Sequence, residues 1–240
     1  MRCRWRAAAT VATLTVTAAC GGGGGGSAAP SSAKTPSTPA GNTQSATTAD
    51  DQALAQRANL RLADFPPEWK ASPVDPAATA ASEASDRAFA DCMGRPPPEQ
   101  VRTARADSQD FSAEETRRAS SNVEVVRTVD IARDDFAAQR TDKALECRKA
   151  QIDAEFRRQV PDAVPTTMIE RLDLPQFGDQ SLAFRVVAIG QVQGQEVRTY
   201  IDLAFVQKGR AEMSGGFINR TTPFPSDLEK TLLQRMVGRA

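Results

Sequence analysis

A stretch near the N-terminus limits how much of this chain can fold. Residues 21–50 are mostly Gly, Ser, Thr, Ala and Pro, and they contain no Leu, Ile, Val or aromatic residue. Such a segment cannot bury enough apolar surface to offset the conformational entropy that is lost on ordering. The sequence therefore predicts a flexible tether over residues 20–57 and one folded domain over residues 58–240, a length that suits one domain better than two.

The residues before the tether have the layout of a secretory signal peptide. Three arginines stand among the first six residues, residues 7–16 are apolar and threonine-rich, and small residues precede Cys20. The apolar part is too short to span a bilayer as a stable helix. The pattern resembles the bacterial lipoprotein signal, although Thr17 stands where that signal usually has Leu. This resemblance implies that residues 1–19 are removed and that Cys20 carries the lipid. The alternative is an ordinary secreted protein cleaved near Ala19, in which Cys20 has no such role.

The rest of the chain alternates between helical and extended patterns. Helices are expected over residues 79–92, over residues 134–159 with a break near Thr141, and from Pro225 onward. Strands are expected over residues 101–106, 123–129, 168–174, 182–192, 196–207 and 210–218, with a short hairpin turn at 193–195. This order predicts an α+β fold, in which helices flank an antiparallel sheet.

An aromatic cluster stands at the start of the domain. Phe65 and Trp69 flank two prolines and follow the alternating Leu60 and Leu62. Such a cluster either closes the bottom of a core or forms an exposed rim for a lipid or glycan, and we favour the core.

Four cysteines occur in the sequence, and two of them fall in the expected domain. Cys3 leaves with the signal peptide and Cys20 takes the lipid, so Cys92 and Cys147 remain. An even pair in an exported protein indicates a structural disulfide, here joining the end of the first helix to the second. The alternatives are a redox pair, which is usually closer in sequence, and a metal site, which two thiols without histidine leave incomplete.

Several short segments carry a resemblance. They are Leu62-Ala63-Asp64-Phe65-Pro66 with Trp69, Cys92 with Gly94, Ser108 with Asp110-Phe111, and Ser120-Ser121-Asn122-Val123-Glu124-Val125 before an amphipathic helix that holds Cys147. Together they resemble actinobacterial envelope lipoproteins with PsbP-like folds and the extracellular sensor domains of receptor serine/threonine kinases. The resemblance covers about residues 58–240. It implies an antiparallel sheet flanked by helices and a non-enzymatic, ligand- or partner-binding role, and it assigns no binding residues.

Histidine is absent from the chain, which excludes several chemistries. There is no Ser-His-Asp or Cys-His constellation, no imidazole base and no HExxH zinc site. The glycine run at 21–26 precedes no strand–helix unit, so it is not a phosphate loop. We therefore expect no cofactor and no metal. After Ala19 the chain has 27 basic and 30 acidic residues without a basic stripe, which predicts no nucleic-acid binding.

Adjacent acids are the visible candidates for catalysis. Asp134–Asp135 and Glu114–Glu115 are such pairs, and paired carboxylates are the machinery of glycoside hydrolases. Neighbouring acids on polar stretches are usually solvated, and Asp134–Asp135 falls where acids near a helix N-terminus are expected. We therefore assign no catalytic residue.

These observations lead to one expected function and two alternatives. We expect a non-catalytic domain, anchored by lipid on the extracytoplasmic face of the cell membrane, that binds a ligand or partner. Candidates for the partner are an envelope lipid, a glycan and a membrane protein. The alternatives are a cell-wall glycan hydrolase that uses paired carboxylates and an accessory subunit of a membrane protein.

Overall fold

The computed structural model describes the fold of residues 42–159, 166–192 and 195–240. Residues 40–240 group into one compact unit. The expected signal peptide, the expected lipidation site Cys20 and the first part of the expected tether lie outside the described residues, as do positions 193 and 194 of the expected hairpin turn. Among the helices of the described ranges, none is both long and apolar enough to cross a membrane.

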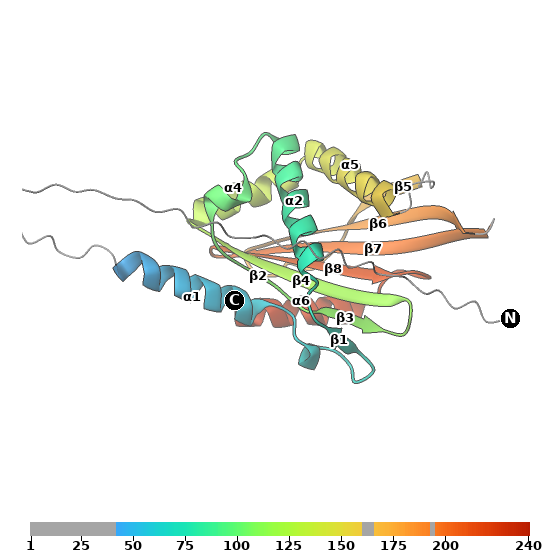
Figure 1. Ribbon diagram of the computed structural model, residues 1–240, viewed down its shortest axis with the longest axis horizontal. Coiled ribbons are helices and arrows are strands. Elements are labelled where there is room, and N and C mark those ends of the chain that lie inside the picture. Colours follow the sequence, from blue (N-terminus) through green and yellow to red (C-terminus); the bar gives the residue numbers. More distant parts are fainter. Residues whose placement is uncertain (1–41, 160–165, 193–194) are drawn as a thin grey trace, which may run out of the picture. The chain divides into compact units, whose positions relative to one another are not determined.

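An antiparallel sheet forms the centre of the fold (Figure 1). In the described ranges it has eight strands in the order β1-β3-β4-β8-β7-β6-β5, and β2 also pairs with β4. The expected α+β class and the antiparallel sheet flanked by helices are thus confirmed. The strands are β1 (Lys70–Ser72), β2 (Arg102–Asp107), β3 (Asp110–Ala113), β4 (Arg117–Val126), β5 (Thr166–Leu172), β6 (Gln180–Val192), β7 (Gln195–Lys208) and β8 (Ala211–Asn219).

Helices cover both faces of the sheet. Helices α1 and α6 lie on one face, and α2, α4 and α5 lie on the other (Figure 1). The helical segments are α1 (Asn42–Ala58), the 3-10 turn η1 (Leu62–Asp64), α2 (Pro76–Met93), α3 (Pro98–Val101), α4 (Val129–Gln139), α5 (Asp142–Gln159) and α6 (Ser226–Arg239).

Helix α1 corrects the boundary expected between tether and domain. Ala55 and Ala58 are fully buried in the core, and Asp51 is 2% exposed. The Asp51 carboxylate forms an ion pair with Arg210 and accepts a hydrogen bond from Thr103 Oγ1 at 2.6 Å. The folded unit therefore begins before residue 58. The lack of large apolar residues does not mark the start of the folded unit, because alanine favours helix and its small side chain lets the helix approach the sheet closely.

One strand boundary differs from the sequence pattern, and one expected helix break is confirmed. The strand expected over residues 123–129 runs from Arg117 to Val126, because Thr128 is the N-cap of α4 and accepts a hydrogen bond from the Ile131 N–H. The break expected near Thr141 is confirmed, since α4 ends at Gln139 and α5 begins at Asp142.

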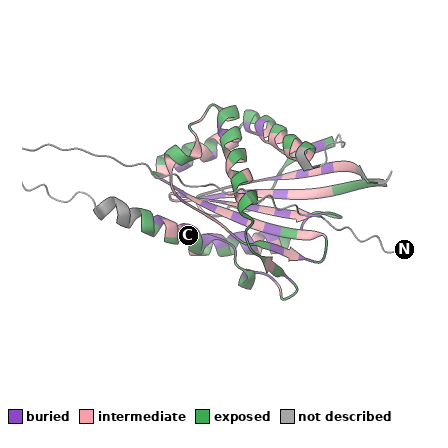
Figure 2. Cartoon of the chain, in the orientation of Figure 1, coloured by how far each residue is buried: buried purple, intermediate pink, exposed green. Residues whose placement is uncertain are grey.

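The two faces of the sheet differ in how well they are packed. Along β8, residues alternate strictly between buried and partly exposed (Figure 2). The buried set, which includes Met213 and Phe217, contacts α6 residues such as Leu233. Phe65 and Trp69 are 8% and 3% exposed and belong to the same core, which confirms the core interpretation of the aromatic cluster. The partly exposed set faces α2, α4 and α5.

The expected disulfide is confirmed. It joins Cys92, near the end of α2, to Cys147 in α5, with the two Cα atoms 5.9 Å apart. A second link runs between the same helices, because Gln151 donates hydrogen bonds from Nε2 to Ser85. The disulfide therefore holds together two helices of the layer over the less tightly packed face.

Candidate functional site: a cavity between the sheet and the helical layer

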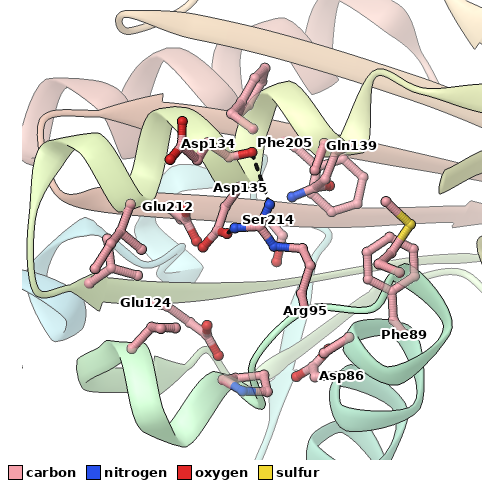
Figure 3. A pocket seen from close by; sticks show the side chains of 18 of the residues that line it. Asp86, Phe89, Arg95, Glu124, Asp134, Asp135, Gln139, Phe205, Glu212 and Ser214 are labelled. Carbon is pink, nitrogen blue, oxygen red and sulfur yellow. Dashed lines mark hydrogen bonds and ion pairs between the residues drawn. The ribbon is translucent and has the colours of Figure 1, made fainter.

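A cavity of about 300 Å³ lies between the sheet and helices α2, α4 and α5. Its volume is at the lower end of the range for small-molecule sites. Figure 3 shows its labelled residues around a common space, contributed by α2, the segment after it, α4 and the strands. Its wall contains both aromatic and charged side chains, including Phe89, Phe205, Asp86, Arg95 and Glu212.

Two glutamates on neighbouring strands form part of the cavity floor. Glu124 of β4 and Glu212 of β8 are directly opposite each other in the antiparallel register. Opposite residues in such a pair have Cβ atoms about 5 Å apart. Asn122 and Ser214 form the next pair along the same face. The floor is therefore polar, whereas the other face of the same strands belongs to the core.

Of the two glutamates, Glu212 has fewer hydrogen-bond and charge partners for its carboxyl group. Its Oε1 atom is buried and has no hydrogen-bond partner among the described residues. Burial raises the pKa of Glu212 to about 8, the neighbouring charge of Glu124 adds to this, and Arg95 opposes it. Glu212 is therefore mainly protonated at neutral pH, and its carboxyl group is a hydrogen-bond donor as well as an acceptor.

Glu124 is held by two arginines of β2. Its Oε1 atom accepts hydrogen bonds from Arg102 Nη1 at 2.7 Å and from Arg105 Nη1 at 3.1 Å. Arg105 also donates to Asp86 of α2 at 2.6 Å. Burial raises the pKa of Glu124, and the two arginines oppose that rise. The charges of Glu124 and Asp86 are thus matched by neighbouring guanidinium groups.

Arg95 connects the end of α2 to α4. It pairs with the Asp135 carboxylate and donates from Nη1 to the backbone oxygen of Asp134 at 3.2 Å. Both bonds are visible in Figure 3, where Arg95 points towards Asp134 and Asp135. Asp135 is therefore also matched by a cation.

Arg148 of α5 has a different environment. Its guanidinium carbon lies 4.4 Å from the ring centroids of both Phe89 and Phe205, so the cation is stacked between two aromatic rings. Its Nη2 donates to Gln139 Oε1 at 3.1 Å, and no described carboxylate forms an ion pair with it. Burial lowers the pKa of Arg148 to about 10, and the more distant charge of Asp86 opposes this. A half-buried guanidinium without an acidic partner among the described residues thus lines the cavity.

The structure separates the two acidic pairs singled out in the sequence. Asp134 and Asp135 line the cavity, whereas Glu114 and Glu115 are exposed between β3 and β4. Glu114 has a positive φ of 57° and forms an ion pair with Arg117. The second pair therefore takes no part in the cavity.

Sequence reasoning missed the three residues that mark the cavity most clearly. Glu124 and Glu212 each stand between apolar neighbours in a strand, which indicates an acid on the less buried face of a sheet. Their direct pairing depends on the register between strands almost ninety positions apart. Arg148 carried no local signal, since it is one of several charged residues in α5.

The described residues contain no group of three or more His, Cys, Asp or Glu side chains with metal-site geometry. Comparison with protein-family models, with curated proteins and with solved structures finds no match to this chain.

Proposed function

We propose that the chain is an extracytoplasmic lipoprotein whose domain binds a small ligand between the sheet and the α2–α4–α5 layer. The N-terminal sequence pattern supports the membrane anchor at Cys20, and the Cys92–Cys147 disulfide fits an oxidising compartment. In this proposal the domain is non-catalytic, and the α1 helix brings the start of the folded unit closer to the anchor than the sequence predicts.

The cavity carries the proposal. A concave site with apolar walls and a few convergent polar groups is the usual form of a small-molecule site. Here the apolar walls include Phe89, Phe205 and Val126, and the polar groups include Arg148 and Glu212. The Glu212 Oε1 atom is buried without a described hydrogen-bond partner, and the half-buried Arg148 guanidinium has one described hydrogen bond. Leaving the buried Glu212 oxygen unpaired costs about 1–3 kcal/mol, so a ligand that satisfies it gains that free energy.

Native mass spectrometry of the full chain tests the proposal. The chain carrying Cys20→Ser is exported by a bacterial host and purified from the medium without detergent. We expect a co-purifying small molecule, which Ser214→Phe removes because the larger side chain points from β8 into the cavity. Ser120→Phe is the matched control, since Ser120 lies on the same face of the sheet but does not line the cavity. Loss of the ligand from both variants, or from neither, contradicts the proposed site.

The glutamate pair supports a second candidate, a hydrolase that acts on cell-wall glycans. In glycosidases one carboxyl group is protonated and a second is ionised across the bond to be cleaved. Glu212, with a pKa of about 8, fits the acid, and Glu124, which accepts hydrogen bonds from two arginines, fits the second carboxyl group. Release of reducing sugar ends from purified cell wall by the full chain, abolished by Glu212→Gln, would establish this activity. An intact wall after prolonged incubation excludes it and leaves the binding function.

A further inference from the structure

We propose that the ligand of this cavity is an anionic amphipathic molecule, a carboxylate or phosphate joined to a short apolar chain, and that Arg148 binds its charged group. The inference rests on the proposed binding function and names the ligand class. The guanidinium offers five N–H donors, and only Nη2 has a described partner, the Gln139 side-chain oxygen. Carboxylates and phosphates match that donor geometry and form the stronger, charge-assisted kind of hydrogen bond.

The position of Arg148 favours an anion over other polar ligands. Stacking between Phe89 and Phe205 fixes the guanidinium plane and leaves its edge as the route for hydrogen bonds. The side chain is partly accessible, and it lines the cavity. Because no described carboxylate pairs with this half-buried cation, an incoming anion supplies the missing counter-charge through charge-assisted hydrogen bonds.

The acids around the cavity do not prevent an anion from binding. Asp86 is paired with Arg105, and Asp135 is paired with Arg95. Glu124 is paired with both Arg102 and Arg105. Asp134 is largely exposed to solvent at the side of α4. Glu212 is protonated at neutral pH and therefore offers the anion an O–H donor in place of a like charge.

The remaining wall suits an apolar chain. It is formed by aliphatic, aromatic and methionine side chains from both layers, among them Met93, Val126, Ile131 and Phe136. A volume of about 300 Å³ limits the enclosed part of the chain to a short one. Two kinds of ligand have this combination of an anionic group and an apolar chain, namely a free fatty carboxylate and the phosphate end of an envelope lipid.

Four eight-carbon probes separate the contribution of the charged group from that of the chain. The full chain with Cys20→Ser is titrated with octanoate, octyl phosphate, octanol and octylamine by calorimetry at neutral pH. We expect octanoate or octyl phosphate to bind about ten- to hundred-fold more tightly than octanol, as one or two charge-assisted hydrogen bonds provide. The tighter of the two anions identifies the source.

Arg148→Met supplies the decisive variant. Methionine keeps an apolar side chain between the two rings and removes only a half-buried charge that has no carboxylate partner, so the fold is retained. We expect this variant to bind octanol as before and to lose the preference for the anions. Arg157→Met is the matched control, because Arg157 is an exposed arginine of the same helix. It should leave all four affinities unchanged.

The outcomes distinguish the ligand class from the binding function. If all four probes bind with similar affinity, or if octylamine binds most tightly, the cavity binds ligands and the anion inference is wrong. If none binds to the full chain, the proposed binding function fails as well. If the anions bind equally well to Arg148→Met, their site lies elsewhere and the role of Arg148 is overturned.

Discussion

Glu229→Gln changes how the stability of this protein depends on pH. Glu229 of α6 is 2% exposed and faces the core, where its Oε1 atom has no described hydrogen-bond partner. Burial raises its pKa from 4.5 to about 7, and the nearby charge of Asp202 contributes, while Arg185 and Lys230 oppose the rise. Arg185 is already engaged with Asp202 through two hydrogen bonds of 2.7 Å. Glu229 is therefore a carboxyl group that the folded state keeps protonated.

The sign and size of the effect follow from proton linkage. Below pH 4.5 the carboxyl group is protonated in both states, and its full contribution to stability is present. As the pH rises to about 7, the unfolded chain loses this proton before the folded chain does, so stability falls. The difference between 4.5 and about 7 corresponds to a loss of about 3 kcal/mol, which is complete above pH 7.

Urea unfolding at a series of pH values measures this effect. The other titrating groups are common to both proteins, so the difference in free energy of unfolding between wild type and Glu229→Gln isolates this carboxyl group. We expect the difference to shift by about 3 kcal/mol in favour of the variant between about pH 4 and about pH 8. A difference that stays constant within about 0.5 kcal/mol over this range refutes the reasoning.

Three further changes test the architecture. Replacing Cys92 and Cys147 together by Ser opens a link between residues 55 positions apart and should lower the free energy of unfolding by about 4 kcal/mol in the chain-entropy model; urea unfolding with unchanged stability would contradict it. Asp51→Ala should cost about 2 kcal/mol, because Arg210 loses its carboxylate partner, and a neutral effect would place α1 outside the folded unit. Gly178→Ala should cost about 1–3 kcal/mol by thermal unfolding, since φ is +59° and an added Cβ would lie 2.5 Å from a backbone oxygen of β7; an unchanged melting temperature counts against that geometry.

Much of the fold follows from local sequence patterns. The strands expected over residues 182–192, 196–207 and 210–218 and the helix expected from Pro225 onward match β6, β7, β8 and α6 closely, because each has one face packed against a common core. Helix α1 escaped prediction because its evidence is tertiary. Ala55 and Ala58 show no apolar pattern of their own and become core residues only when the sheet lies beside them.

The candidate site was less predictable than the fold, for a physical reason. The disulfide could be predicted from the number of cysteines in the domain and the oxidising compartment expected for an exported protein. The cavity instead depends on which strands are neighbours and which helix covers them. Glu124 meets Glu212 through the β4–β8 register, and Arg148 meets Phe205 only because α5 folds back over β7. No local pattern contains that information.

A crystal structure of the full chain carrying Cys20→Ser, grown with the tighter-binding of octanoate and octyl phosphate, tests the central claim most directly. The account predicts electron density for the probe between the sheet and the α2–α4–α5 layer, with its anionic group within hydrogen-bond distance of Arg148 and its alkyl chain against Phe205. Density for the probe elsewhere on the molecule, with the cavity holding only water, would contradict the claim that this space is the binding site.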